Sequence, residues 1–216
     1  RLDSTLKTYN DHRVALDKRS ICHAPSYGMH VGQNGNISPC SYTRFTPFGK
    51  YPEQNLHDIW FGKEANEWRK SMLNKEFPKP CHVCNVDFKT KQFNQMRAAS
   101  FDKFASSPFE KAVNKTKTFF KNGKFTEYPK EMAFELANTC NLECVMCIGM
   151  LSSSIRQNRD KLPPLPQVYG KEFLEELKEF IPHLEEAKFF GGEPFLIDIY
   201  LDIWELFIAL NPTCRI

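Results

Sequence analysis

The sequence lacks a strong excess of charge of either sign and lacks a long uninterrupted apolar run. Its 216 residues carry 29 Lys and Arg against 26 Asp and Glu, a surplus too small to indicate a nucleic-acid or anionic-membrane surface. The longest apolar stretch, 195–210, is interrupted by Asp198, Asp202 and Glu205, which is typical of a core helix and excludes a membrane span. We therefore expect a soluble globular protein without a transmembrane segment.

The N-terminus lacks a start methionine and lacks the apolar segment of a secretory signal. Residues 1–4 are mostly polar, and no apolar stretch of the required length follows them. These features predict cytoplasmic localisation, and we expect the chain to be incomplete.

Cysteine is too scarce for a disulfide scaffold, which contains roughly 8–10% cysteine in a short chain. The chain has 8 cysteines among 216 residues, and they are clustered. In a reducing compartment, clustered thiols are more often metal ligands than disulfides. They form a set of four, a set of three and one alone: Cys22, Cys40, Cys81 and Cys84; Cys140, Cys144 and Cys147; and Cys214.

The set of four is attached to a predicted hairpin and helix. Two short runs, 29–31 and 36–38, flank the turn 32–35, whose Asn-Gly pair is a strong hairpin signal because both residues tolerate positive φ. Apolar positions between 56 and 73 then follow near-helical spacing, which predicts a helix, broken at Gly62, that covers the hairpin. We expect the hairpin and the loop beyond this helix to supply the four thiols.

The second half of the chain alternates strands and helices. An apolar run at 132–137 predicts a strand, and the spacing at 173–181 predicts an amphipathic helix. A strand at 187–190, a helix from 195 to 210 and the beginning of a further strand at Arg215 follow. This alternation is the pattern of a parallel sheet, so we assign the chain to the α/β class.

The set of three follows the first strand of this half and is expected at the start of a helix. Three thiolates are one fewer than a closed site needs, so a cubane iron–sulfur cluster bound here keeps one iron open to a substrate or cofactor. The alternative is a zinc site in which a distant His or thiol supplies the fourth ligand. A second motif follows the next predicted strand: Gly191, Gly192, Glu193 and Pro194.

The spacing and order of these two motifs resemble the radical S-adenosylmethionine (SAM) superfamily, over Glu131 to Ile216. The resemblance implies that Cys140, Cys144 and Cys147 hold a [4Fe-4S] cluster whose open iron is chelated by the amino and carboxylate groups of SAM. A reduced cluster of this kind supplies the electron that breaks the SAM carbon–sulfur bond, and the resulting 5′-deoxyadenosyl radical abstracts a hydrogen atom from substrate.

The same resemblance implies the SAM-binding residues. Gly191, Gly192 and Glu193 are expected along the methionyl amino group of SAM, with Pro194 shaping the turn. Met146 stands where the family often has an aromatic residue against the adenine, and a thioether can also pack on a flat ring. No catalytic acid or base can be selected from the sequence.

The set of four, taken from its residues alone, suits zinc and an iron–sulfur cluster equally. However, Cys22-x12-Gly35-x4-Cys40 and the closing Cys81-x2-Cys84, with a helix between them, resemble the twitch domain, a shortened form of the SPASM domain. This resemblance implies an auxiliary [4Fe-4S] cluster bound by all four thiols. With no open iron, such a cluster is suited to electron transfer or scaffolding.

Three segments are predicted from these patterns. Residues 1–90 are expected to form a small α+β twitch/SPASM-like domain, 91–130 a partly helical linker, and 131–216 the first βα units of a partial (β/α)6 radical SAM barrel. The order departs from the usual one, in which the auxiliary domain follows the barrel. Because the chain ends as a third strand begins, we expect a fragment of a longer protein that is inactive by itself.

The predicted function is therefore that of a radical SAM enzyme with an auxiliary iron–sulfur cluster. The resemblance implies a peptide, protein or small-metabolite substrate and an external electron donor such as flavodoxin or ferredoxin. A zinc-stabilised binding module without catalysis is the alternative, because zinc also accepts these thiolate spacings. RNA is disfavoured as a substrate by the small net charge and by the lack of a basic stripe with interleaved aromatics.

Overall fold

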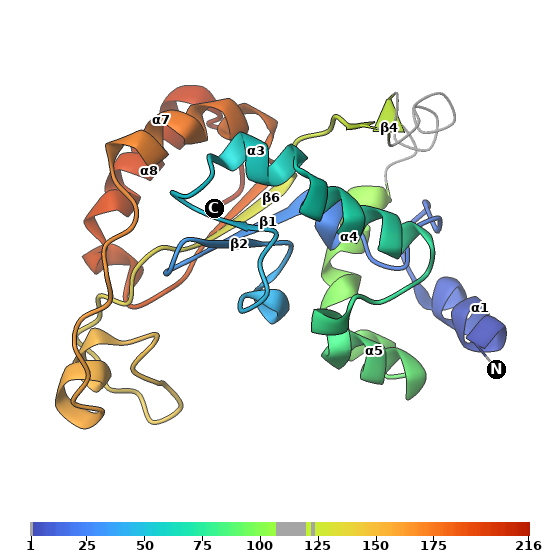
Figure 1. Cartoon of the computed structure of the whole chain (residues 1–216), viewed down its shortest axis with the longest axis horizontal. Helices are drawn as coiled ribbons and strands as arrows, with labels where there is room; N and C mark the ends of the chain where they lie inside the picture. Colours follow the sequence, from blue (N-terminus) through green and yellow to red (C-terminus); the bar gives the residue numbers. More distant parts are fainter. Residues whose placement is uncertain (1, 107–119, 122–123) are drawn as a thin grey trace.

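A five-stranded mixed sheet forms the centre of the computed structural model, which describes residues 2–106, 120–121 and 124–216 (Figure 1). Its strand order is β3-β2-β1-β6-β7. A separate two-stranded hairpin pairs β4 with β5. The strands are β1 (Gly28–Gly32), β2 (Asn36–Ser38), β3 (Gly49–Lys50), β4 (Phe120–Lys121), β5 (Lys124–Phe125), β6 (Glu131–Glu135) and β7 (Glu186–Phe189).

The sheet joins strands from the two ends of the sequence. The predicted hairpin is confirmed, because β1 pairs antiparallel with β2. On its other side β1 pairs in parallel with β6, which places His30 opposite Ala133, and β6 pairs in parallel with β7. Arg215 bridges in parallel to Glu186, where the sequence predicts a further strand. The mixed α/β class expected from the sequence is therefore confirmed.

Helices cover one face of the sheet and form the larger hydrophobic core with it (Figure 1). Strand alternation turns Met132 and Phe134 into this core, where both are fully buried, and turns Glu131 and Glu135 to the opposite face. Phe134 stacks on Phe189 with ring centroids 5.0 Å apart. The helices are α3 (Leu56–Phe61), α4 (Lys63–Leu73), α7 (Lys171–Phe180) and α8 (Asp198–Leu210). Of these, α4 continues from α3 beyond the strands (Figure 1).

Helix α3 is capped by Asn55, whose side chain accepts a hydrogen bond of 2.7 Å from the Asp58 amide. Gly62 separates α3 from α4, as the sequence predicts, and has extended backbone angles. A Cβ atom at Gly62 would lie only 2.3 Å from the Asp58 carbonyl oxygen, so the break requires glycine.

A second hydrophobic core surrounds the four clustered thiols. A buried ion pair joins two of its elements, with Arg13 Nε donating to Asp102 Oδ2 at 2.8 Å. Trp68 of α4 packs against both cores and connects them. The elements around this core are α1 (Leu2–His12), α2 (Ala24–Tyr27), the short helix η2 (Lys79–Cys81), α5 (His82–Lys89) and the 3-10 helices η3 (Phe93–Gln95) and η4 (Arg97–Ala105).

The two cores do not follow the segment boundaries predicted at residues 90 and 131. The sheet core combines β1 and β2 with β6 and β7, and the thiol core extends to Ala105. Much of the predicted linker 91–130 is therefore core, since Phe93, Phe101 and Phe104 are buried in it. Residues 107–119 and 122–123 of that linker lie outside the described residues. Within the described part of the chain, no helix is long and apolar enough to cross a membrane.

Candidate iron–sulfur sites

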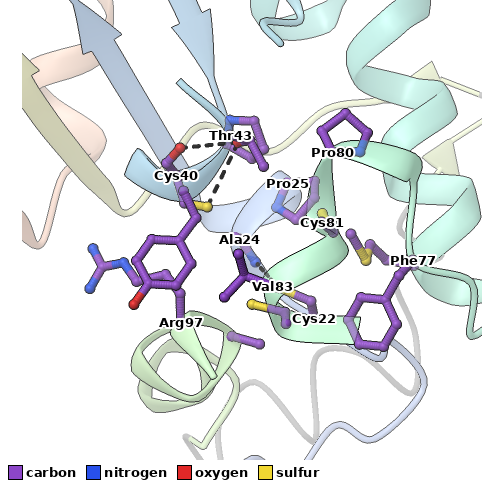
Figure 2. A pocket seen from close by; sticks show the side chains of 15 residues that line it. Cys22, Ala24, Pro25, Cys40, Thr43, Phe77, Pro80, Cys81, Val83 and Arg97 are labelled. Carbon is purple, nitrogen blue, oxygen red and sulfur yellow. Dashed lines mark hydrogen bonds between the residues drawn. The ribbon is translucent and has the colours of Figure 1, made fainter. Parts of the chain in front are cut away.

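The structure brings the thiols of the four-cysteine set to one pocket. Cys22 lies in the loop before α2, and Cys40 follows β2, whereas Cys81 and Cys84 come from η2 and α5. All four line the same cavity, and Figure 2 shows Cys22, Cys40 and Cys81 around it. The sequence placed these residues on a hairpin and a distant loop, and the fold makes them neighbours.

The pocket is lined mainly by apolar groups that exclude water from the thiols. Cys22, Cys40 and Cys84 are each less than one-tenth exposed, and Cys81 is partly buried. A low-dielectric wall of this kind disfavours a charged thiolate unless a cation compensates it. The apolar residues of the lining include Pro25, Pro39, Met72, Phe77, Pro80 and Val83.

Burial raises the pKa of all four thiols. Desolvation raises the pKa of Cys22 well above its ordinary value, and the charges of the other three cysteines add to the effect. The pKa of Cys81 rises to about 12 for the same two reasons. The pKa values of Cys40 and Cys84 are also raised, first by burial. In the absence of a cation the four groups are therefore protonated at neutral pH, and binding of a metal releases their protons.

Backbone amides are directed at three of these sulfur atoms. The Ala24 amide donates to Cys22 Sγ at 3.4 Å. Backbone amides near Thr43 oppose the rise in the pKa of Cys40, and those of Arg97 and Ala98 oppose the rise in the pKa of Cys84. Such donors stabilise thiolate over thiol and tune metal centres held by cysteine.

These observations show that the pocket fits a group that binds several thiolates. It offers four soft sulfur donors in an enclosed apolar space, which suits zinc or an iron–sulfur cluster. The side chains are in free-thiol geometry, since among the described residues no three metal-ligating groups stand at the distances of a completed site. Loading the pocket therefore requires movements that draw the sulfurs together.

The set of three lies on a loop that follows β6 and is folded on itself by hydrogen bonds from its own polar side chains. The hydroxyl groups of Ser153 and Ser154 both donate to the Cys140 carbonyl, at 3.0 and 2.9 Å. The Cys147 amide donates to the Cys144 carbonyl at 2.9 Å, which closes a turn. Cys144 is exposed, and the other two thiols are partly buried.

The prediction that this motif starts a helix is wrong. The cysteines lie in turns, and the nearest helical element is a short π-helix at Ile155–Arg159. The physical reason is competition for the backbone, because serine hydroxyl groups occupy carbonyls that a helix would pair with amides. Ser152 adds a further bond of 2.7 Å to the Leu142 carbonyl.

The Gly-Gly motif is hydrogen-bonded to the chain that leads into Cys140. The Gly192 amide donates to Ala137 O at 3.1 Å, and the Glu193 amide donates to Thr139 O at 2.8 Å. A Cβ atom at Gly192 would lie 1.9 Å from Thr139 O, and Gly191 has a φ of +105°. This approach of two backbones requires glycine at both positions. The two motifs therefore form one unit at the carboxyl ends of β6 and β7.

A second pocket lies beside the Gly-Gly motif. Gly191, Gly192 and Pro194 form part of its lining, and Phe189 and Glu135 form other parts. The four-cysteine segment also contributes to it through Ser41 and Arg44. The Arg44 guanidinium donates to Glu135 Oε1 at 3.0 Å.

Two of the predicted SAM-binding residues lie apart from this pocket lining. The side chain of Glu193 accepts a bond of 3.4 Å from the Phe195 amide, so it caps the following 3-10 helix, η7 (Pro194–Leu196). The side chain of Met146 is 85% exposed. None of the three thiols of the cysteine loop lines the pocket beside the Gly-Gly motif.

The two cysteine sets lie at opposite ends of the sheet strands. Cys40 follows β2, which runs antiparallel to β1, and is therefore level with the beginning of β6. Cys140 lies beyond the end of β6. The five residues of β6 span roughly 16 Å at about 3.3 Å per residue. Figure 1 accordingly shows the yellow-orange loop after β6 and helix α5 on opposite sides of the sheet.

Four thiols, three of them buried, around one apolar pocket define a site of the metal- or cluster-binding class. Residues 22–85 match the SPASM family, an iron–sulfur cluster-binding domain, and the matched range contains all four cysteines. SPASM domains are associated with radical SAM enzymes. The match favours an iron–sulfur cluster over zinc in this pocket. No match was found among curated proteins or solved structures.

Sequence reasoning missed several residues that shape these sites. Arg44 and Glu135 come from segments far apart in the chain, so no local pattern connects them. Arg97 lines the thiol pocket from a segment predicted to be a linker. The run of serines at 152–154 was the one available signal, because serine side chains commonly hydrogen-bond nearby backbone.

Proposed function

We propose that this protein is a radical SAM enzyme that carries an auxiliary [4Fe-4S] cluster. The observation that supports it most is the SPASM match over four cysteines that line one buried pocket. The spacing of the set of three, and the hydrogen bonds from the Gly-Gly motif to the chain that leads into Cys140, support the catalytic part of the proposal.

In this proposal Cys140, Cys144 and Cys147 hold a SAM-binding [4Fe-4S] cluster. When bound, such a cluster supplies the electron for homolytic cleavage of SAM to a 5′-deoxyadenosyl radical that abstracts hydrogen. The chain's own residues position the parts. The bonds from Gly192 and Glu193 fix the Gly-Gly motif against the chain that leads into Cys140.

The pocket beside the Gly-Gly motif is the candidate place for SAM. It combines apolar walls, such as Phe189 and Phe190, with the charged pair Arg44 and Glu135. Gly191, Gly192 and Pro194 line this pocket and are proposed to contact the methionyl end of SAM. Glu193 is proposed for the same end and Met146 for the adenine, and both must turn toward the pocket from outside its lining. Because Arg44 and Ser41 come from the four-cysteine segment, that segment helps to form the SAM pocket as well as its own site.

The remaining parts of the proposal follow from the enzyme class. Cys22, Cys40, Cys81 and Cys84 hold the auxiliary cluster, which transfers electrons or supports the fold. The substrate is a peptide, a protein or a small metabolite, and the electrons come from a donor such as flavodoxin or ferredoxin. We propose a cytoplasmic location, because both clusters require a reducing compartment.

The test is SAM binding at the cluster of the cysteine loop. The chain is reconstituted anaerobically with iron and sulfide and reduced, and its electron paramagnetic resonance (EPR) spectrum is recorded with and without SAM. We expect SAM to change the spectrum of one cluster, and Cys144→Ala to abolish that change. Cys214→Ala is the matched control, because Cys214 is partly buried and belongs to neither set.

Two results would contradict the proposal. One is a colourless protein that takes up zinc and no iron or sulfide, which would indicate a zinc-stabilised binding module. The other is a SAM-induced change that persists in Cys144→Ala, which would show that other ligands hold the SAM-binding cluster.

A further inference from the structure

Arg97 lies beside the four-thiol pocket but outside the range 22–85 that matches the SPASM family. It is the first residue of η4, and its side chain lines the pocket together with Cys40 and Cys84. Figure 2 shows Arg97 on the same side of the pocket as Cys40. No sequence motif marks this residue.

The guanidinium of Arg97 places a permanent positive charge on the lining of the thiol pocket. A cation in this apolar lining favours negative charge on the sulfur atoms around it.

The charge of Arg97 is only partly neutralised by its neighbours. Arg97 Nη2 lies 3.4 Å from Glu131 Oε1. The same carboxylate also pairs with Lys103 and Lys188, and both lysines pair with Glu186 as well. Arg97 Nε is buried and has no hydrogen-bond partner among the described residues. Of these three cations, Arg97 is the one that lines the thiol pocket.

We propose that Arg97 raises the reduction potential of the iron–sulfur cluster held by Cys22, Cys40, Cys81 and Cys84. This inference rests on the proposed assignment of an iron–sulfur cluster to that pocket. Reduction adds one electron from an external one-electron donor, with no bond made or broken, so the cluster and its four thiolates become more negative. A nearby cation stabilises the reduced form more than the oxidised form.

Arg97 is thus a tuning residue rather than a ligand. Its position outside the matched range means that the segment after Cys84 contributes to the electronic properties of the site. An arginine suits this role because its guanidinium stays protonated and is more weakly hydrated than an ammonium group.

The test measures the midpoint potential of this cluster alone. Cys140, Cys144 and Cys147 are replaced by Ala in the 216-residue chain, which leaves a single cluster, and the protein is reconstituted anaerobically. The reconstituted protein is titrated with dithionite, and EPR follows the reduced cluster. Arg97→Gln and Arg97→Lys are compared in this background. Lys103→Gln is the matched control, because Lys103 lies on the same helix and pairs with the same Glu131 but does not line the pocket.

We expect Arg97→Gln to shift the midpoint to a more negative potential, Arg97→Lys to restore most of the shift, and Lys103→Gln to leave it unchanged. If Arg97→Gln and its parent have equal midpoint potentials, the inference is overturned. That result does not affect the cluster assignment, because both proteins still bind iron. Equal shifts for Arg97→Gln and Lys103→Gln would also overturn the inference, since the effect would then be one of general charge. A parent protein that binds no iron would refute the cluster assignment itself, and the inference with it.

Discussion

Gly192→Ala should disrupt the contact between the Gly-Gly motif and the cysteine loop. The added Cβ would lie 1.9 Å from Thr139 O, whereas ordinary contact begins at 3.4 Å, so the carbonyl must move by about 1.5 Å. Such a movement breaks the bonds of the Gly192 and Glu193 amides to residues 137 and 139. Two lost hydrogen bonds cost roughly 2 kcal/mol, and the remaining backbone strain adds about 1–3 kcal/mol.

The assay is urea unfolding of the reduced, metal-free chain, with Gly170→Ala as the matched control. A Cβ atom at Gly170, the N-cap of α7, meets only a flexible Glu172 carboxylate at 3.5 Å, so this variant should lose no more than about 1 kcal/mol, the cost of alanine at an N-cap. In reconstituted protein, Gly192→Ala should also weaken the SAM-induced EPR change, because Cys140 directly follows Thr139. If Gly192→Ala and Gly170→Ala have free energies of unfolding within about 0.5 kcal/mol of each other, the close backbone approach does not exist as described.

Two further predictions concern the thiol core. Asp102→Asn should reduce the free energy of unfolding by about 3–5 kcal/mol, because it leaves the buried Arg13 guanidinium without its carboxylate. Glu67→Gln breaks an exposed pair with Lys63 and should change the free energy of unfolding by less than about 1 kcal/mol. Equal losses in Asp102→Asn and Glu67→Gln would contradict the role given to the buried pair. The pKa of His23 is lowered by burial and by Arg13, so the folded state binds fewer protons than the unfolded state below the ordinary histidine pKa. The free energy of unfolding should therefore fall as the pH drops from about 7 to about 5. In urea titrations, His23→Phe should reduce this dependence on pH. An unchanged pH dependence in His23→Phe would show that His23 is not its source.

The local parts of the fold were predictable from the sequence. The Asn-Gly turn and its flanking strands are confirmed, because the signal lies within a few residues. The break at Gly62 is confirmed for the same reason. The amphipathic spacing predicted α7, whose apolar side faces the sheet core.

The arrangement of the sheet could not be predicted in this way. The pairing of β1 with β6 joins segments separated by about a hundred residues. Neither strand has a sequence pattern that identifies the strand with which it pairs. The separation into predicted domains missed this pairing. As a consequence, the four-cysteine segment and the cysteine loop are connected through one sheet, and a change in one can alter the stability of the other.

The ligands of the candidate sites were predictable from the sequence, but the residues that surround those ligands were not. Spacing and order identify the thiols, since ligand geometry restricts both. The pocket walls come from distant segments, as in the pairing of Arg44 with Glu135. The serine hydroxyl groups that hold the cysteine loop replaced the helix expected there.

The most direct test of the two-site proposal is the iron and acid-labile sulfide content of the anaerobically reconstituted chain and of Cys81→Ala and Cys144→Ala. Two cubane clusters give about eight irons per chain, and each variant should retain about four. SAM should still change the EPR spectrum of Cys81→Ala but not that of Cys144→Ala. Zinc in place of iron, or loss of all iron in both variants, would contradict two separate iron–sulfur sites.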